Sequence, residues 1–364
     1  MTKTYENQLL QLIGQWFTQL STYKLEEARK LKKEIDDLLS PIHLPKQIES
    51  YYDLVNLKHQ LITNEITLQS NFYRSDLLDK DVLETTDRTL KYLHKFMQAT
   101  ILMNNEDYIH SIESLRIAEK SLDYVSRFEQ AEFYFRTGYV YYRLDQNITA
   151  LNYLNRSYHL VRNSIHHDRL KANLSIIKAG ILSEAGYDRE SIECSEKAVL
   201  LSTHEPLTKS MAIRSKANNE FRFGRFNKAA ELYLSALNTG NQNKSNVGIK
   251  SRFNLAHSWL KMGALDWGKE MLNQVEGEIQ NKAQSLSEFT ARGIICRELY
   301  LHDRPDPIKI NMGLSILKEK KLLYELRDVT KELSNFHLHN EEYKLAYYYL
   351  DYTNYVVPIL GGDL

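Results

Sequence analysis

The side chains best suited to recognise a ligand in this sequence are two asparagines, Asn219 and Asn254. Each lies two residues from a small residue, Ala217 or Ala256, in a pattern that recurs along the chain on stretches with helical periodicity. An asparagine amide can donate one hydrogen bond and accept another, which suits the backbone of an extended peptide. We therefore predict that both residues bind a short peptide in a groove; the alternative is that they only satisfy neighbouring helix groups.

Residues that carry out catalysis unaided do not form any familiar motif here. The twelve histidines include no HExxH pair and no cluster with cysteines at metal-ligand spacing. The sequence also contains no GxSxG elbow, no GxxxxGKS or GxxxxGKT loop and no GxGxxG turn after a strand. We predict no metal and no cofactor, and we expect that any chemistry depends on a partner protein.

The segment that organises the chain runs from Arg127 to Val161 and fits one helix–turn–helix unit of the tetratricopeptide type. Tyr134, Gly138 and Tyr141 fill the aromatic, small and tyrosine positions of its first helix, and Ala150 is the small residue of its second. Small residues at these contacts allow two antiparallel helices to approach closely. One such unit cannot bury its own apolar face, so copies must flank it.

Those copies are visible as small residues that recur every 37 to 41 residues. Seven residues after each of these markers comes a turn position, and twelve residues after it comes the contact of the second helix. The markers are Ala99, Gly138, Ala179, Ala217, Ala256, Gly293 and Ser334. The turn positions are Glu106, Asp145, Gly186, Gly224, Gly263, Tyr300 and Glu341. The contacts are Ser111, Ala150, Ser191, Ala229, Gly268, Pro305 and Ala346. The sixth unit departs from the pattern, and we expect Pro305 and Pro307 to interrupt its hairpin.

The first part of the chain does not follow this period but contains three amphipathic helical blocks. They are Asn7 to Leu20, Lys24 to Leu39, and a third that starts near Pro45 and runs through Ile62. The predicted fold is all-α, with an N-terminal three-helix bundle followed by a right-handed superhelical solenoid of six or seven hairpins and no sheet. The predicted divisions are a bundle at 1–68, a linker at 69–88 and a solenoid at 89–364.

Composition excludes several partners. The 47 basic and 47 acidic side chains cancel, so no global field attracts nucleic acid or an anionic membrane. The charged run from Glu26 to Asp37 alternates in sign, as in a solvated helix face. Two isolated thiols, Cys194 and Cys296, indicate a reducing compartment, and no apolar run has membrane-spanning length. We predict a cytoplasmic protein without direct nucleic-acid or membrane contact.

Four segments resemble one family: QWF at Gln15–Phe17, YYDLVNLKHQLI at Tyr51–Ile62, DYIHSIESLRIAEKSL at Asp107–Leu122 and FEQAEFYFRTGYVYYRLDQ at Phe128–Gln146. They are similar to the Rap proteins of Bacillus and its phages, known as response regulator aspartate phosphatases. The resemblance covers nearly the whole chain at low identity. Family members combine a three-helix bundle, a linker and a tetratricopeptide solenoid, the order predicted above from periodicity.

The resemblance implies a quorum-sensing regulator, for example of sporulation or competence. Rap-like proteins engage response regulators through the bundle, either removing the phosphoryl group from aspartate or blocking DNA binding. Secreted pentapeptides bound in the solenoid switch them off. The implied partners of this chain are therefore a response regulator protein and a short signalling peptide.

The chain departs from the family at the catalytic position. Phosphatase members have a glutamine five residues before the tyrosine pair, whereas this chain has Lys46 there and Gln47 next to it. A glutamine can hold the attacking water in line with the phosphorus, but lysine has no acceptor for that water's proton. Gln47 is thus the candidate catalytic residue, on the condition that the third helix starts with a turn rotated by one residue, about 100°, which Pro45 just before it allows. Sequestration of the response regulator without hydrolysis is the open alternative.

The peptide anchors depart as well. Peptide-responsive members have an asparagine two residues before a repeat marker and an aspartate in the preceding repeat, where this chain has Ser215 and Ser183. Asn254 keeps the amide position in the next repeat. Two other functions compete with a Rap-like regulator: a non-catalytic tetratricopeptide scaffold, and a peptide-sensing transcription factor, which the missing DNA-binding helix pair disfavours.

Overall fold

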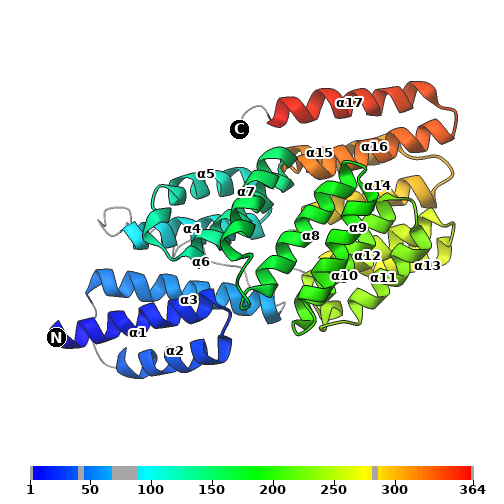
Figure 1. The fold of residues 1–364 in the computed structure, drawn as a ribbon. Helices are drawn as coiled ribbons and strands as arrows, with labels where there is room; N and C mark the ends of the chain where they lie inside the picture. The colour runs from blue at the N-terminus through cyan, green and yellow to red at the C-terminus, as the bar shows by residue number, and fades with distance from the viewer. Residues whose placement is uncertain (1–2, 40–44, 68–87, 281–285, 362–364) are drawn as a thin grey trace.

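The computed structural model describes residues 3–39, 45–67, 88–280 and 286–361 (Figure 1). Within these ranges the chain forms seventeen α-helices and no β-strand, which confirms the all-α prediction. The helices are α1 (Lys3–Ser21), α2 (Leu25–Leu39), α3 (Lys46–Thr67), α4 (Arg88–Asn104), α5 (Tyr108–Glu119), α6 (Arg127–Arg143), α7 (Asn147–Val161), α8 (Asp168–Glu184), α9 (Asp188–Leu201), α10 (Pro206–Arg222), α11 (Phe226–Leu237), α12 (Asn246–Lys261), α13 (Leu265–Gln280), α14 (Ser287–Leu301), α15 (Pro307–Glu319), α16 (Leu323–His339) and α17 (Tyr343–Gly361). Two short 3-10 turns, η3 (Leu122–Tyr124) and η4 (Gln242–Lys244), join hairpins. None of the described helices is both long and apolar enough to cross a bilayer.

Helices α1, α2 and α3 form the N-terminal bundle. The stripe predicted on α1 is its buried face, because Ile13, Trp16 and Leu20 are all shielded from solvent. The indole Nε1 of Trp16 donates to Nδ1 of His59 at 3.0 Å, so the polar edge of this large core residue is satisfied. Most of the predicted linker at 69–88 lies outside the described residues.

The remaining helices pair into seven antiparallel hairpins, from α4–α5 to α16–α17. The predicted small residues lie at the helix contacts. A Cβ added to Gly138 would meet Leu154 Cγ at 2.9 Å and the carbonyl oxygen of Ala150 at 3.2 Å. In the first hairpin the hydroxyl of Ser111 donates to the Ala99 carbonyl at 2.9 Å. The solenoid therefore depends on close helix approach at the positions that the repeat pattern marks.

The turn positions also behave as the pattern requires, because six of the seven predicted residues have a positive φ, from 61° to 81°. They are Glu106, Asp145, Gly186, Gly224, Gly263 and Glu341. Each follows the end of a first helix, where a left-handed residue satisfies the last carbonyls and reverses the chain. Glycine adopts this conformation without strain, whereas the three acidic residues do so at a cost. The exception, Tyr300, lies inside α14.

The sixth hairpin forms despite its two prolines, so the expected interruption is wrong, but α14 and α15 pack less extensively than the helices of the other described hairpins. Pro305 lies in the connection, and Pro307 is the first residue of α15, where no backbone donor is needed. The side chain of Asp306 caps this helix by accepting from the Ile308 amide at 2.9 Å. The close contact between the two helices is made by Gly313, where an added Cβ would lie 2.7 Å from Ile295 Cγ1. The longer connection displaces the contact without breaking the hairpin.

The bundle packs on the solenoid through α3 and α4. At this junction Nζ of Lys58 lies 2.5 Å from Oε1 of Glu129, and both side chains are buried. Lys58 also donates to the Ser21 hydroxyl at 3.0 Å. Both charges thus have partners in a region that excludes water, which ties α1 and α3 to α6.

Candidate functional site

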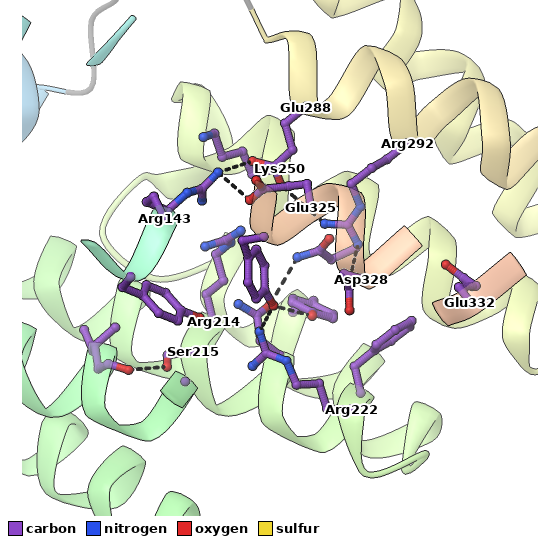
Figure 2. Close-up of a pocket in the computed structure, with 18 of the residues that line it drawn as sticks. Arg143, Arg214, Ser215, Arg222, Lys250, Glu288, Arg292, Glu325, Asp328 and Glu332 are labelled. Carbon is purple, nitrogen blue, oxygen red and sulfur yellow. Dashed lines mark hydrogen bonds and ion pairs between the residues drawn. The ribbon is translucent and has the colours of Figure 1, made fainter. Parts of the chain in front are cut away.

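A cavity of about 580 Å³ lies on the inner side of the solenoid. Its walls come mainly from the first helices of successive hairpins: α6, α8, α10 and α12 on one side and α14 and α16 on the other (Figure 2). The volume falls within the range typical of ligand pockets.

Ion pairs between distant hairpins join the two walls. Arg143 of α6 lies 3.0 Å from Glu288 of α14 and 2.5 Å from Glu325 of α16 (Figure 2). Arg327 of α16 reaches back to Asp145, at the turn after α6, at 2.8 Å. These side chains are largely shielded from solvent, so replacing Glu288 or Asp145 would leave the positive charge of Arg143 or Arg327 without that partner.

The two glutamates at this junction titrate in opposite directions. Burial alone would raise the pKa of Glu288, but the positive charges of Arg143, Lys250 and Arg292 outweigh it and hold the pKa at about 2. Burial raises the pKa of Glu325 to about 8, because the attraction of Arg143 is weaker than desolvation and Glu288 adds repulsion. Glu325 therefore carries its proton at neutral pH, and Glu288 carries the negative charge.

Two asparagines on the cavity wall form a hydrogen-bonded pair. Nδ2 of Asn254 donates to Oδ1 of Asn218 at 3.1 Å, and the Tyr233 hydroxyl donates to the same oxygen at 2.7 Å. In the described part of the chain no other residue bonds to Oδ1 of Asn254 or to Nδ2 of Asn218. The pair therefore leaves one acceptor and one donor available to a ligand.

The structure brings only some of the predicted peptide-binding residues to this cavity. Asn254 and Ser215 line it, and the Ser215 hydroxyl donates to the Ile176 carbonyl at 3.4 Å. Asn219 is only 1% exposed and donates to the Ser195 hydroxyl at 2.9 Å, away from the lining. Ser183 is also buried outside the lining, where its hydroxyl donates to the Gly180 carbonyl at 2.8 Å.

Asn218 is the lining residue that sequence reasoning missed. It follows Ser215 by three residues on α10, and Asn219 follows Ser215 by four, about 100° further round the helix, where its side chain reaches Ser195 of α9. Spacings of three and four from Ser215 select both asparagines, so helical periodicity alone does not separate them. The basic residues of the lining were missed because isolated arginines on helices carry no motif.

The candidate catalytic residue lies elsewhere, in the first turn of α3. Gln47 is exposed, and so is Lys46, the first residue of that helix. Pro45 directly precedes this helix, and its carbonyl accepts from the Ile48 amide at 2.9 Å. No bond joins the Gln47 side chain to another described residue. Its amide is therefore free to contact a partner protein.

Free thiols and metal ligands add no further site among the described residues. Cys194 and Cys296 are unpaired, and burial raises the pKa of both thiols. Within the ranges that the structure describes, no group of three His, Cys, Asp or Glu side chains is placed to hold a metal ion.

Known proteins resemble both parts of the chain. Residues 3–64 match the family model described as response regulator aspartate phosphatase H, N terminal. Response regulator aspartate phosphatase I of Bacillus subtilis (strain 168) is 23% identical over 352 residues, covering 92% of this chain and 88% of its own. Type II methyltransferase M.CeqI of Rhodococcus hoagii is 27% identical over 341 residues, covering 93% of this chain. The present chain spans only 65% of that methyltransferase's length.

The fold has a close counterpart among solved structures. A Rap protein complexed with Competence and Sporulation Factor superposes with a TM-score of 0.90, covering 98% of this chain and 100% of that one. Its sequence identity is 18%, so the likeness concerns the fold of bundle and solenoid. The family-model match over the bundle and the full-length phosphatase relative show that the chain is similar in sequence to Rap proteins, and the solved structure shares its fold of bundle and solenoid.

Proposed function

We propose that this chain is a cytoplasmic Rap-type regulator in which a short extended peptide, bound in the solenoid cavity, controls the engagement of a response regulator by the bundle. The proposed division is the bundle at 1–68, the linker at 69–88 and the solenoid at 89–364. Two unpaired cysteines support a reducing compartment. The observation that carries the peptide assignment is the pair Asn218 and Asn254, which offers a free donor and a free acceptor on the cavity wall.

The pair fits a peptide backbone because each residue of an extended strand presents one N–H and one C=O group. The free Oδ1 of Asn254 would accept from the first and the free Nδ2 of Asn218 would donate to the second. Tyr139, Ile177 and Phe221 line the same cavity and supply apolar surface for side chains. Backbone bonds then provide affinity, and the apolar walls select among peptides.

Calorimetry with synthetic pentapeptides, including any encoded beside this gene, tests the assignment. Asn254→Ala should weaken binding by about 1 to 3 kcal/mol, roughly 5- to 150-fold, because a peptide N–H loses its acceptor in a shielded site. Asn219→Ala is the matched control, because Asn219 lies outside the lining and its side chain contacts it only through a hydrogen bond that Arg222 donates at 3.4 Å. Equal losses in both variants, or no binding of any peptide, would refute the proposal.

The bundle is proposed to contact the response regulator. The family-model match over residues 3–64 supports this assignment. The buried Lys58–Glu129 pair offers a route by which the solenoid influences the bundle, since it joins α3 to α6. Titration of candidate response regulators with the chain, with and without peptide, tests the link: binding that is indifferent to a peptide known to occupy the cavity would contradict it.

We further propose that Gln47 holds the water that attacks an aspartyl phosphate on the bound response regulator. Its exposed amide at the start of α3 can accept from that water and donate to a phosphoryl oxygen. The test follows loss of phosphoryl label with wild type, Gln47→Ala and Lys46→Ala. Equal acceleration by wild type and Gln47→Ala would exclude the catalytic role. Binding without acceleration by any of the three would make the chain an inhibitor by occupancy.

A further inference from the structure

The cavity carries more positive than negative charge. Seven basic and four acidic side chains line it. The basic residues are Arg143, Arg214, Arg222, Lys250, Lys261, Arg292 and Lys331. The acidic residues are Glu288, Glu325, Asp328 and Glu332. Each acidic residue already lies within 4 Å of a basic residue of the lining, so the excess cations must find partners elsewhere.

Among the excess basic residues, Arg214 has a donor nitrogen, Nε, that is shielded from solvent and lacks a hydrogen-bond partner. It lies on α10 beside Ser215. No ion pair joins it to a described carboxylate, and Figure 2 shows no dashed line at its guanidinium. A guanidinium has five N–H donors and no acceptor, so a shielded one is incomplete without an anion.

The neighbouring arginines show what Arg214 lacks. Burial alone would lower the pKa of Arg143 and of Arg222, but nearby carboxylates and tyrosines outweigh it and raise both. For Arg214 burial prevails and the pKa is lowered. Glu288 is the carboxylate whose negative charge acts on Arg214, but no ion pair joins the two: the oxygens of Glu288 accept from Arg143 at 3.0 Å and from Arg292 at 3.3 Å.

We propose that Arg214 binds a carboxylate of the peptide, so that the ligand class of this chain is a short peptide with an acidic group at this point. The inference rests on the proposed peptide-binding function. A carboxylate matches the planar fork of the guanidinium with two parallel hydrogen bonds. Lys250, which also forms no ion pair with described residues, adds positive charge near Glu288. A lysine or arginine side chain placed here would instead meet like charge.

Two sources can supply the carboxylate: an Asp or Glu side chain, or the C-terminus of the peptide. The probes are pentapeptide libraries in which one position is fixed as Asp, Asn or Lys, each made with a free-acid and an amidated C-terminus. The tightest individual binder then enters calorimetry beside its Asp→Asn and amidated forms. One of the two changes should weaken binding roughly 10- to 150-fold, and that change identifies the source.

Arg214→Gln should cause a similar loss and should abolish the difference between the acid and amide peptides, whereas Arg214→Lys should retain part of it. Lys331→Gln is the matched control, since it removes an exposed lining charge and should change affinity only a few-fold. If Arg214→Gln does not fold, the acid and amide peptides on the wild-type chain decide. Equal affinity for both, with Asn254→Ala still impairing binding, would overturn the role of Arg214 and leave the proposed function intact. No binding of any library would refute the proposed function itself.

Discussion

Glu325 gives the sharpest test of the electrostatics around the cavity. It is 1% exposed, and burial raises its pKa to about 8. In the unfolded chain the same carboxyl titrates near its ordinary value of 4.5. At a pH between these two pKa values, the Glu325 carboxyl therefore binds a proton when the chain folds. The stability that Glu325 contributes is complete below pH 4.5 and is lost as pH rises through 8.

The size of the effect follows from this proton. Between pH 6 and 7.5 the folded chain holds it and the unfolded chain does not, so this group lowers the free energy of unfolding by about 1.4 kcal/mol per pH unit. Over that interval the loss is about 2 kcal/mol. Glu325→Gln keeps the shape of the protonated carboxyl but cannot titrate. The stability of the variant relative to wild type should thus rise by about 2 kcal/mol from pH 6 to 7.5.

Urea unfolding at pH 6, 6.5, 7 and 7.5 measures this difference. Tryptophan fluorescence is a suitable signal because Trp259 and Trp267 lie on the α12–α13 hairpin, and α12 lines the cavity. Glu220→Gln is the control. Burial would raise the pKa of Glu220, but hydrogen bonds from Arg225 and Lys228 outweigh it and lower the pKa. Its pH profile should therefore run parallel to wild type. If the Glu325→Gln profile also stays parallel, the carboxyl is ionised in the folded chain and the reasoning fails.

Two further predictions concern the turns and the junction. Glu341 is exposed and has a φ of 61°, so Glu341→Gly should raise the free energy of unfolding by about 0.5 to 1 kcal/mol. Gly186 has a φ of 81°, so Gly186→Ala should lower the free energy of unfolding by about 1 kcal/mol in the same urea titration. Lys58→Met should cost about 3 to 5 kcal/mol, because it leaves the buried charge of Glu129 alone, and should expose the bundle to limited proteolysis. Adding Glu129→Leu should restore most of the loss; no recovery would show that packing, and not charge, holds the junction.

Sequence pattern predicted the hairpins well because their contacts are local. Gly138 and Ala150 are twelve residues apart, and one turn brings them together. The second-helix contact predicted for the sixth unit, Pro305, is wrong because a fixed offset of twelve residues from Gly293 does not allow for a longer connection. The predicted Asn219 does not lie on the cavity wall, whereas its neighbour Asn218 does, because one residue is about 100° on a helix and a repeat marker does not resolve so small a step. Whether Gln47 is catalytic stays a prediction.

Contacts across the cavity were beyond sequence reasoning for a different reason. The pairing of Arg143 with Glu325 joins the second hairpin to the seventh. Whether such residues meet depends on the small rotation between successive hairpins, summed over five steps. No local pattern encodes that sum, so neither the bridging pairs nor the unmatched Arg214 could be identified before the fold was known.

The bridging pairs change the kind of cooperativity open to this solenoid. In a repeat array whose units contact only their neighbours, each end can fray by itself, and unfolding spreads along a line. Arg143 and Arg327 connect the second hairpin with the seventh, so hairpins two to seven form a closed loop of contacts. A loop resists fraying from its C-terminal end, because the last hairpins cannot leave until the bridges break. Once these pairs break, all of the hairpins that they held together can fray. Hairpins two to seven should therefore unfold together and not one by one. A ligand or pH change that weakens the pairs of Arg143 and Arg327 should affect this unfolding most.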